Sequence, residues 1–310
     1  MAVVLHIGLP KTGSSYLQEW LSLNREILWA DGLHVVSADA AHRLGTEAAA
    51  GVADTQRRDV RQIQSSCAFS DAIGEIQVPG RKTIVASEYL SMGRPECLAE
   101  ILASAKVVVS DVICYLRRQD HICASGYAQA VKALGHSERI GTALHTDRLD
   151  WHQLYETWRD AFPQATLHIY NYDKCHAEGR LLRSYKEALG AGGLATQDLA
   201  QYVNLSLSAE MTEIARMLNE RGKLFDPDCL LKIQNGRRFV PFGFSKKTTA
   251  EFEELFIASN RKLAARFPQE FSDYAQPGWR SKGDDLTDQI SPASMAEILM
   301  EYVHQRSAAA

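Results

Sequence analysis

The first sixteen residues constrain the fold more than any other part of the chain. A mainly apolar run at 3–7 predicts a buried strand, and a loop bounded by Gly8 and Gly13 follows at once. The apolar spacing over 16–21 then predicts a helix. A strand, a glycine loop and a helix in this order bind phosphate, because loop N–H groups point inward and the helix N-terminus carries about half a positive charge. We therefore expect a phosphate-binding loop.

The position of the lysine distinguishes this loop from the loop of nucleoside-triphosphate-binding proteins. That loop has the pattern G-x-x-x-x-G-K-[ST]. Gly8 and Gly13 keep the glycine spacing, but Ser14 follows the second glycine and the lysine, Lys11, lies inside the loop. The loop can therefore hold phosphate, but the usual lysine over the β- and γ-phosphates is missing.

The segment PKTGSSY, at 10–16, resembles the P-K-[ST]-G-T-T-[WY] loop of the PAPS-dependent sulfotransferases. In that family the loop binds the 5′-phosphosulfate of 3′-phosphoadenylyl sulfate (PAPS). The resemblance implies a donor-binding set of Pro10, Lys11, Thr12, Gly13, Ser14, Ser15 and Tyr16. It implies that Lys11 contacts the oxygen that bridges sulfate and 5′-phosphate, and that Ser14 and Ser15 bind the 5′-phosphate. Tyr16 either stacks on adenine or packs in the core.

A second signature follows the third expected strand. Arg117 and Ser125 are eight residues apart, the spacing with which sulfotransferases hold the 3′-phosphate of the nucleotide. An arginine at the carboxyl edge of a parallel sheet faces the ligand crevice, and its planar fork binds phosphate through two bonds.

The stretches 204–208 and 259–264 resemble bacterial sulfotransferases of the carbohydrate-type group. The family's C-terminal R-K-G-x-x-G-D-W-K motif has only a faint echo at 280–283.

Transfer to an acceptor hydroxyl needs a general base, and Glu88 is the candidate. It follows an apolar run at 83–87, at the carboxyl end of a predicted strand, where the active sites of α/β proteins lie. A salt bridge or helix cap is the alternative role for this residue. His34 is the second candidate for the base, and His6, inside the first strand, is expected to be a hydrogen-bonded core histidine.

Strand and helix patterns alternate along the first part of the chain, which predicts a parallel sheet. After the first strand, further strands are expected at 83–87, 106–117 and 165–170. The predicted fold is α/β, with a P-loop NTPase-like parallel sheet flanked by helices and a mostly helical C-terminal region. We expect one domain over 1–310: a nucleotide-binding core at 1–175 and a helical portion at 176–310. An irregular insertion at about 29–80 is expected to include a charged surface helix at 54–64.

Composition excludes several classes of partner. The formal net charge of −4 argues against broad nucleic-acid binding, so an anion site must be a local basic cluster. No apolar run approaches the length of a membrane span, and no leader pattern precedes the first strand. The 6 cysteines and 10 histidines form no metal motif. We expect a cytoplasmic protein without a metal ion, and the resemblance noted above implies a bacterial one.

The sequence predicts an enzyme that transfers a sulfuryl group from PAPS to a hydroxyl or amine, leaving adenosine 3′,5′-bisphosphate. The acceptor is a carbohydrate, a polysaccharide or a small metabolite, and the oligomeric state stays open. A small-molecule kinase that uses ATP and Mg²⁺ is the alternative, because the apolar run at 107–109 leads to Asp111 as in a Walker B strand. A non-catalytic nucleotide-binding interaction protein is a third possibility.

Overall fold

The computed structural model describes residues 2–53, 67–139, 148–199, 206–222, 225–235, 237, 240–281 and 292–308. They form two compact units. The first unit contains Met1–Arg117, Asp150–Val203 and Leu263–Phe271, and the second contains Arg118–Leu149, Asn204–Lys262 and Ser272–Ala310. The surface helix expected at 54–64 lies outside the described residues.

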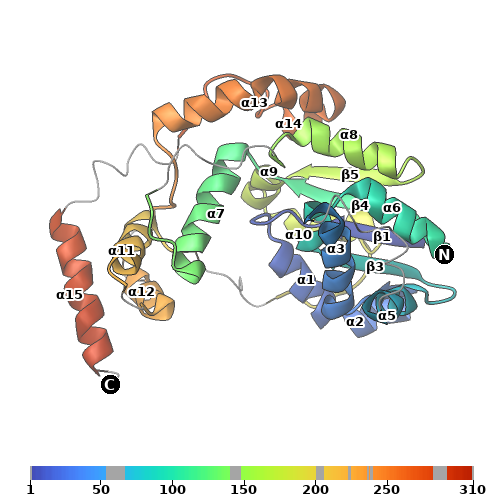
Figure 1. Cartoon of the computed structure of the whole chain (residues 1–310), viewed down its shortest axis with the longest axis horizontal. Helices are drawn as coiled ribbons and strands as arrows, with labels where there is room; N and C mark the ends of the chain where they lie inside the picture. The colour runs from blue at the N-terminus through green and yellow to red at the C-terminus, as the bar shows by residue number, and fades with distance from the viewer. Residues whose placement is uncertain are drawn as a thin grey trace. The chain divides into compact units, whose positions relative to one another are not determined.

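The first unit is built on a parallel sheet, as the sequence predicted. Its described strands are β1 (Ala2–Ile7), β2 (Leu33–Val35), β3 (Lys82–Ser87), β4 (Val108–Leu116) and β5 (Thr166–Asn171). Their order across the sheet is β2-β3-β1-β4-β5, and each neighbouring pair is parallel (Figure 1). Burial on both faces explains the nearly continuous apolar runs of β1 and β4. The predicted α/β class is confirmed.

Helices flank this sheet and make up the second unit (Figure 1). Those of the first unit are α1 (Ser14–Leu23), α2 (Arg25–Ala30), α3 (Ala38–Ala53), α5 (Cys67–Ile76), the 3₁₀ helix η1 (Glu88–Met92), α6 (Pro95–Ser104), α8 (Trp151–Ala161), α9 (Tyr172–Ala177), α10 (Leu181–Leu189) and α14 (Pro268–Phe271). Those of the second unit are α7 (Gln119–Leu134), α11 (Ala209–Glu220), α12 (Pro227–Gln234) and α15 (Pro292–Ala308). Helix α13 (Lys246–Arg266) has residues in both units.

The segment at 29–80 differs from its expected irregular structure. It contains the edge strand β2, which pairs with β3 through Leu33, His34 and Val35. It also contains α3 and α5. A strand of three residues is too short to produce a periodic signal in the sequence, and only its pairing with β3 reveals it.

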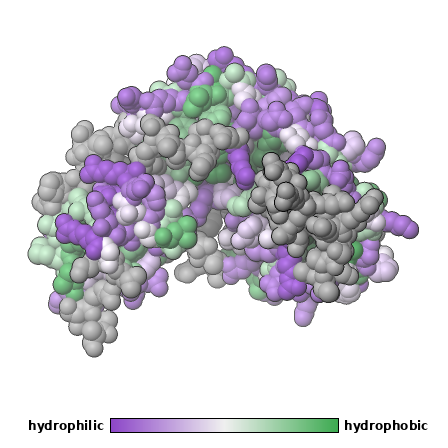
Figure 2. Space-filling view, viewed as in Figure 1, coloured by the Kyte–Doolittle hydropathy of each residue, from purple (hydrophilic) through white to green (hydrophobic). Residues whose placement is uncertain are grey.

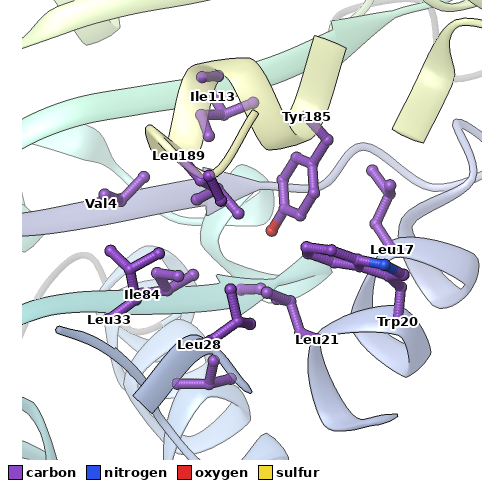
Figure 3. Close-up of a cluster of buried hydrophobic side chains, with 14 of the residues drawn as sticks. Val4, Leu17, Trp20, Leu21, Leu28, Leu33, Ile84, Ile113, Tyr185 and Leu189 are labelled. Carbon is purple, nitrogen blue, oxygen red and sulfur yellow. The ribbon is translucent and has the colours of Figure 1, made fainter. Parts of the chain in front are cut away.

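The main core of the first unit lies between the sheet and helices α1, α2 and α10 (Figure 3). Val4, Ile84 and Ile113 of the strands belong to the same buried cluster as Leu17 and Trp20 of α1. Each of these side chains is fully buried, which stabilises the fold by about 1.5–3 kcal/mol per large apolar residue. This core therefore fixes the start of α1, and with it the glycine loop, against the sheet.

Hydrophilic and hydrophobic side chains both occur on the face that Figure 2 shows, and hydrophilic ones predominate among the coloured residues. Among the described residues, no helix has the length and apolar character needed to cross a membrane. In the same part of the chain, no group of three or more His, Cys, Asp and Glu side chains is placed to hold a metal ion.

Candidate functional site

The site is built at the carboxyl edge of the sheet, where the residues that follow four strands meet. Ile7 of β1 pairs with Ser87 of β3, so Gly8 and Glu88 leave the sheet side by side. Leu116 of β4 pairs with Asn171 of β5, so Arg117 and Tyr172 do the same. Because β1 pairs with both β3 and β4, the four segments lie at one edge.

Two left-handed residues shape the glycine loop. Lys11 has φ 66° and Gly13 has φ 77°. A Cβ at Gly13 would lie 2.9 Å from Leu181 Cδ2 and 3.2 Å from a ring carbon of Tyr172, so a side chain there is excluded by both backbone and packing. Thr12 is buried and donates to the Leu9 carbonyl at 2.7 Å. This hydrogen bond connects the two sides of the loop between Leu9 and Thr12.

Arg117 is fixed directly on this loop. Its Nη1 donates to the Lys11 carbonyl at 3.1 Å, and its Nε donates to Asp173 Oδ1 at 3.3 Å. The guanidinium carbon lies 5.2 Å from the centre of the Tyr172 ring. The Arg117 carbonyl accepts from Trp151 Nε1 at 2.8 Å. These contacts join the end of β4 to the glycine loop and use two of the five guanidinium N–H donors.

The first three side chains of α1 differ in how far they are buried. Ser14 is 2% exposed, and its hydroxyl hydrogen-bonds to Glu88 Oε1. Ser15, the next residue, is exposed at the first turn. Tyr16 is half-buried and packs against the core cluster that includes residues of α1 and α10. Pro10 is half-buried beside Lys11 in the turn.

Glu88 is the first residue of η1 and is held by several backbone contacts. The Ser87 hydroxyl accepts from the Tyr89 N–H at 3.2 Å and so caps this 3₁₀ helix. The Ser91 hydroxyl lies 2.7 Å from the Glu88 carbonyl and 3.2 Å from the Gly8 carbonyl. A Cβ at Gly45 of α3 would lie 2.9 Å from Leu90 N, so glycine lets α3 pack closely on η1. The candidate base therefore begins a segment that is held by hydrogen bonds and by close packing on α3.

Ser125 belongs to the second unit, where it is half-buried on α7. Its assignment to the nucleotide stays a prediction from the sequence. In the same unit, Arg118 Nε and Nη2 donate to both carboxylate oxygens of Asp120, at 2.7 and 2.8 Å. Arg118 Nη2 also donates to the Arg280 carbonyl, and its guanidinium lies 5.0 Å from the Trp279 ring. Residues 282–283, the rest of the segment that weakly resembles the family's C-terminal motif, lie outside the described residues.

Asp111 is placed where it cannot act at the loop. It pairs with Val4 in the sheet, four residues before Gly8, near the amino end of the strands. Its carboxylate binds Lys82 Nζ at 2.8 Å and His168 Nε2 at 2.9 Å. The similarity of β4 to a Walker B strand is therefore not matched by the geometry that metal binding at the loop requires.

The alternative base His34 also lies away from the loop. It occupies the middle of β2, opposite Thr83 rather than the carboxyl end of β3. Its Nε2 lies 2.9 Å from the Glu75 carbonyl oxygen. Burial lowers its pKa, and the nearby Arg25 and Arg81 charges act in the same direction.

Sequence reasoning did not identify Tyr172, Asp173 or Ser91. The first two follow β5 directly, and both contact Arg117. Their position after the last expected strand was an available signal, because parallel strands end at one edge. Ser91 carries no such signal, since its contact with the Gly8 carbonyl depends on how η1 turns after β3.

Comparison with known proteins gives limited similarity. No family model matches the chain. An uncharacterised protein of Archaeoglobus fulgidus is 32% identical over 190 residues, which are 58% of this chain and 52% of that protein. The chain thus spans about half the length of this curated relative. The crystal structure of a sulfotransferase from Alicyclobacillus acidocaldarius aligns with 72% of this chain and 96% of its own, with a TM-score of 0.36 and 14% identity.

Proposed function

We propose that this chain transfers a sulfuryl group from PAPS to a hydroxyl or amine acceptor, such as a carbohydrate or small metabolite. The observation that carries the proposal is the arrangement at one loop: Lys11 lies inside it, Arg117 binds its backbone and Glu88 binds the first residue of the following helix. This arrangement supports a reaction with an anionic donor and a base beside it.

The donor set fits a nucleotide that carries phosphate at two positions. The N-terminus of α1 offers backbone N–H groups and a positive dipole end, and the exposed Ser15 adds a hydroxyl. Lys11 and Arg117 supply two cations from different segments of the chain. Bound PAPS would supply the activated sulfuryl group. In the proposal, the loop holds the 5′-phosphosulfate and Arg117 binds the 3′-phosphate.

The proposed chemistry assigns one task to each charged residue. The S–O bond to the acceptor forms while the S–O bond to the 5′-phosphate breaks. Glu88 accepts the proton that leaves the acceptor hydroxyl. Lys11 stabilises the negative charge that grows on the departing phosphate oxygen. Loss of such a preorganised cation is expected to lower turnover by about 10²–10³-fold.

Thermal unfolding with adenosine 3′,5′-bisphosphate, compared with ATP plus Mg²⁺, tests the donor site. A ligand at a hundred times its dissociation constant stabilises the folded state by about 2.7 kcal/mol, which raises the midpoint by several degrees. We expect this rise with the bisphosphate for the native chain, and its loss in Arg117→Ala. Arg183→Ala on α10 is the matched control, because it removes the same charge from an exposed position.

Transfer itself is measured with ³⁵S-labelled PAPS and a panel of sugars, phenols and amines, with release of sulfate to water as the baseline. Lys11→Met is expected to lower transfer by about 10²–10³-fold while the bisphosphate still binds. Stabilisation by ATP plus Mg²⁺ alone would refute the sulfotransferase proposal. Binding of the bisphosphate without any transfer or hydrolysis would instead favour a nucleotide-binding protein without catalytic activity.

A further inference from the structure

The two serines at the start of α1 are not equivalent in the structure. Ser14 is buried, and its hydroxyl hydrogen-bonds to the Glu88 carboxylate, 74 residues further along the chain. Ser15 is exposed. The sequence resemblance implies that both hydroxyls bind the 5′-phosphate. In the structure, however, only the Ser14 hydroxyl is hydrogen-bonded to Glu88. A hydroxyl has one proton to donate, so a bond to Glu88 removes that donor from the phosphate.

Close packing maintains the Ser14–Glu88 contact. A Cβ on Gly8 would lie 2.9 Å from Ser14 Cβ and 3.7 Å from Glu88 Cγ, so the missing side chain at Gly8 gives these residues room to approach. The Ser91 hydroxyl lies within hydrogen-bond distance of the carbonyls of both Gly8 and Glu88. The loop, α1 and η1 are therefore tied together around one carboxylate.

Burial also limits the alternatives open to Ser14. To reach a ligand, its hydroxyl would have to leave the carboxylate, which would then lose a charge-assisted hydrogen bond. The backbone N–H of Ser14 is at the first turn of α1, where N–H groups have no partner within the helix. This residue can therefore serve the donor through its backbone while its side chain serves Glu88.

We propose that Ser14 is a positioning residue that orients the Glu88 carboxylate, and that Ser15 supplies the side-chain hydroxyl for the donor. This inference rests on the proposed sulfuryl transfer. Through Ser14, the loop that holds the donor also sets the orientation of the base that receives the acceptor's proton. The Ser14–Glu88 hydrogen bond therefore connects the donor-binding loop directly to the base.

The test combines calorimetry with kinetics for Ser14→Ala, Ser15→Ala and Ser14→Thr. Binding is measured with adenosine 3′,5′-bisphosphate, and turnover as sulfate released from ³⁵S-labelled PAPS, with water as acceptor. Ser14→Ala is expected to lower turnover by about 10- to 100-fold, part of the 10²–10⁴-fold that a general base supplies, with bisphosphate affinity within twofold of native. Ser15→Ala is expected to weaken bisphosphate binding instead, and Ser14→Thr, which keeps the hydroxyl, to restore turnover.

A double variant shows whether Ser14 acts through Glu88. In a Glu88→Gln background, Ser14→Ala is expected to cause no further loss, because residues that act as a unit are not additive. Ser22→Ala, an exposed serine on the same helix, controls for general effects on α1. Circular dichroism verifies that each variant is folded.

Two results would overturn this role while leaving sulfuryl transfer intact. The first is a tenfold weaker bisphosphate affinity in Ser14→Ala with unchanged turnover, which would make Ser14 a phosphate ligand. The second is an equal loss of turnover on adding Ser14→Ala to the native and Glu88→Gln chains. Native chain that neither binds the bisphosphate nor releases sulfate from PAPS would refute the proposed function itself, and this inference with it.

Discussion

At the scale of single residues, the loop depends on two left-handed backbone positions with different causes. Gly13 has φ 77°, which glycine adopts at little cost, and it leaves no space for a Cβ. Lys11 has φ 66° although it carries a side chain, a conformation that costs about 1 kcal/mol or more. The hydrogen bond from Arg117 to the Lys11 carbonyl helps to hold that conformation. The lysine position is thus maintained by tertiary contacts.

Gly13→Ala is expected to destabilise the chain by about 2–3 kcal/mol, from the left-handed backbone and the clash with Leu181 and Tyr172. Gly190→Ala is the matched control: its φ is 79°, and a Cβ there would meet no atom within 4 Å beyond its chain neighbours. It should cost only about 1 kcal/mol. Urea unfolding measures both values, and calorimetry should show weaker bisphosphate binding for the Gly13 variant alone. Equal destabilisation of the two variants would contradict the packing argument.

At the scale of elements, the two ends of β4 carry charged side chains that contact different parts of the chain. Arg117 follows its carboxyl end, whereas Asp111 near its amino end links three strands through Lys82 of β3 and His168 of β5. The register between β1 and β4 shifts here, from Val3 opposite Val109 to Val4 opposite Asp111. Burial opposes ionisation of Asp111, but hydrogen bonds from Lys82, His168 and Ser110 outweigh it and lower the pKa.

Asp111→Asn is therefore expected to weaken the sheet without affecting the site. The loss of a half-buried ion pair and its hydrogen bonds should lower the free energy of unfolding by about 1–3 kcal/mol. Adenosine 3′,5′-bisphosphate binding, measured by calorimetry below the unfolding transition, should remain at the native value. A loss of Mg²⁺-dependent nucleotide binding in this variant would instead support the kinase alternative.

Apolar runs in the sequence predicted the strand positions correctly. They did not predict a helix boundary that depends on a contact with a distant segment. The strands expected at 83–87 and 165–170 match β3 and β5 to within a residue at each end. The helix predicted over 16–21 belongs to α1, and α1 is separated from α2 at Asn24, whose side chain exchanges two hydrogen bonds with the Gln197 backbone. Side chain–backbone bonds over 173 residues leave no local signal.

At the scale of the whole molecule, the buried His6 couples stability to pH. Burial lowers its pKa from 6.5 to about 4. Neither ring nitrogen has a hydrogen-bond partner among the described residues, which differs from the hydrogen-bonded core histidine we expected. Its ring lies 4.9 Å from that of Tyr185 and 6.2 Å from that of Tyr115, and burial raises the pKa of both phenols. His6 is therefore neutral in the folded chain at neutral pH.

The sign of the pH effect follows from proton binding. Between pH 6.5 and about 4, the unfolded chain protonates His6 and the folded chain does not, so acid favours unfolding. This residue alone should reduce the free energy of unfolding by about 3 kcal/mol between pH 7 and pH 4. Urea titrations of native chain and His6→Leu at pH 7, 5.5 and 4 measure the difference. The same pH slope in both chains would show that His6 does not carry the effect.

The sequence by itself determined the α/β class, the position of the glycine loop after the first strand and the strand ends that carry Glu88 and Arg117. These features depend on local periodicity, on glycine spacing and on the rule that parallel strands end at one edge. Only the tertiary structure distinguished the buried, hydrogen-bonded Ser14 from the exposed Ser15, placed Asp111 near the amino end, and brought Tyr172 and Asp173 to Arg117. The physical reason is that hydrogen-bond partners and burial are set by contacts between distant segments, which no local pattern encodes.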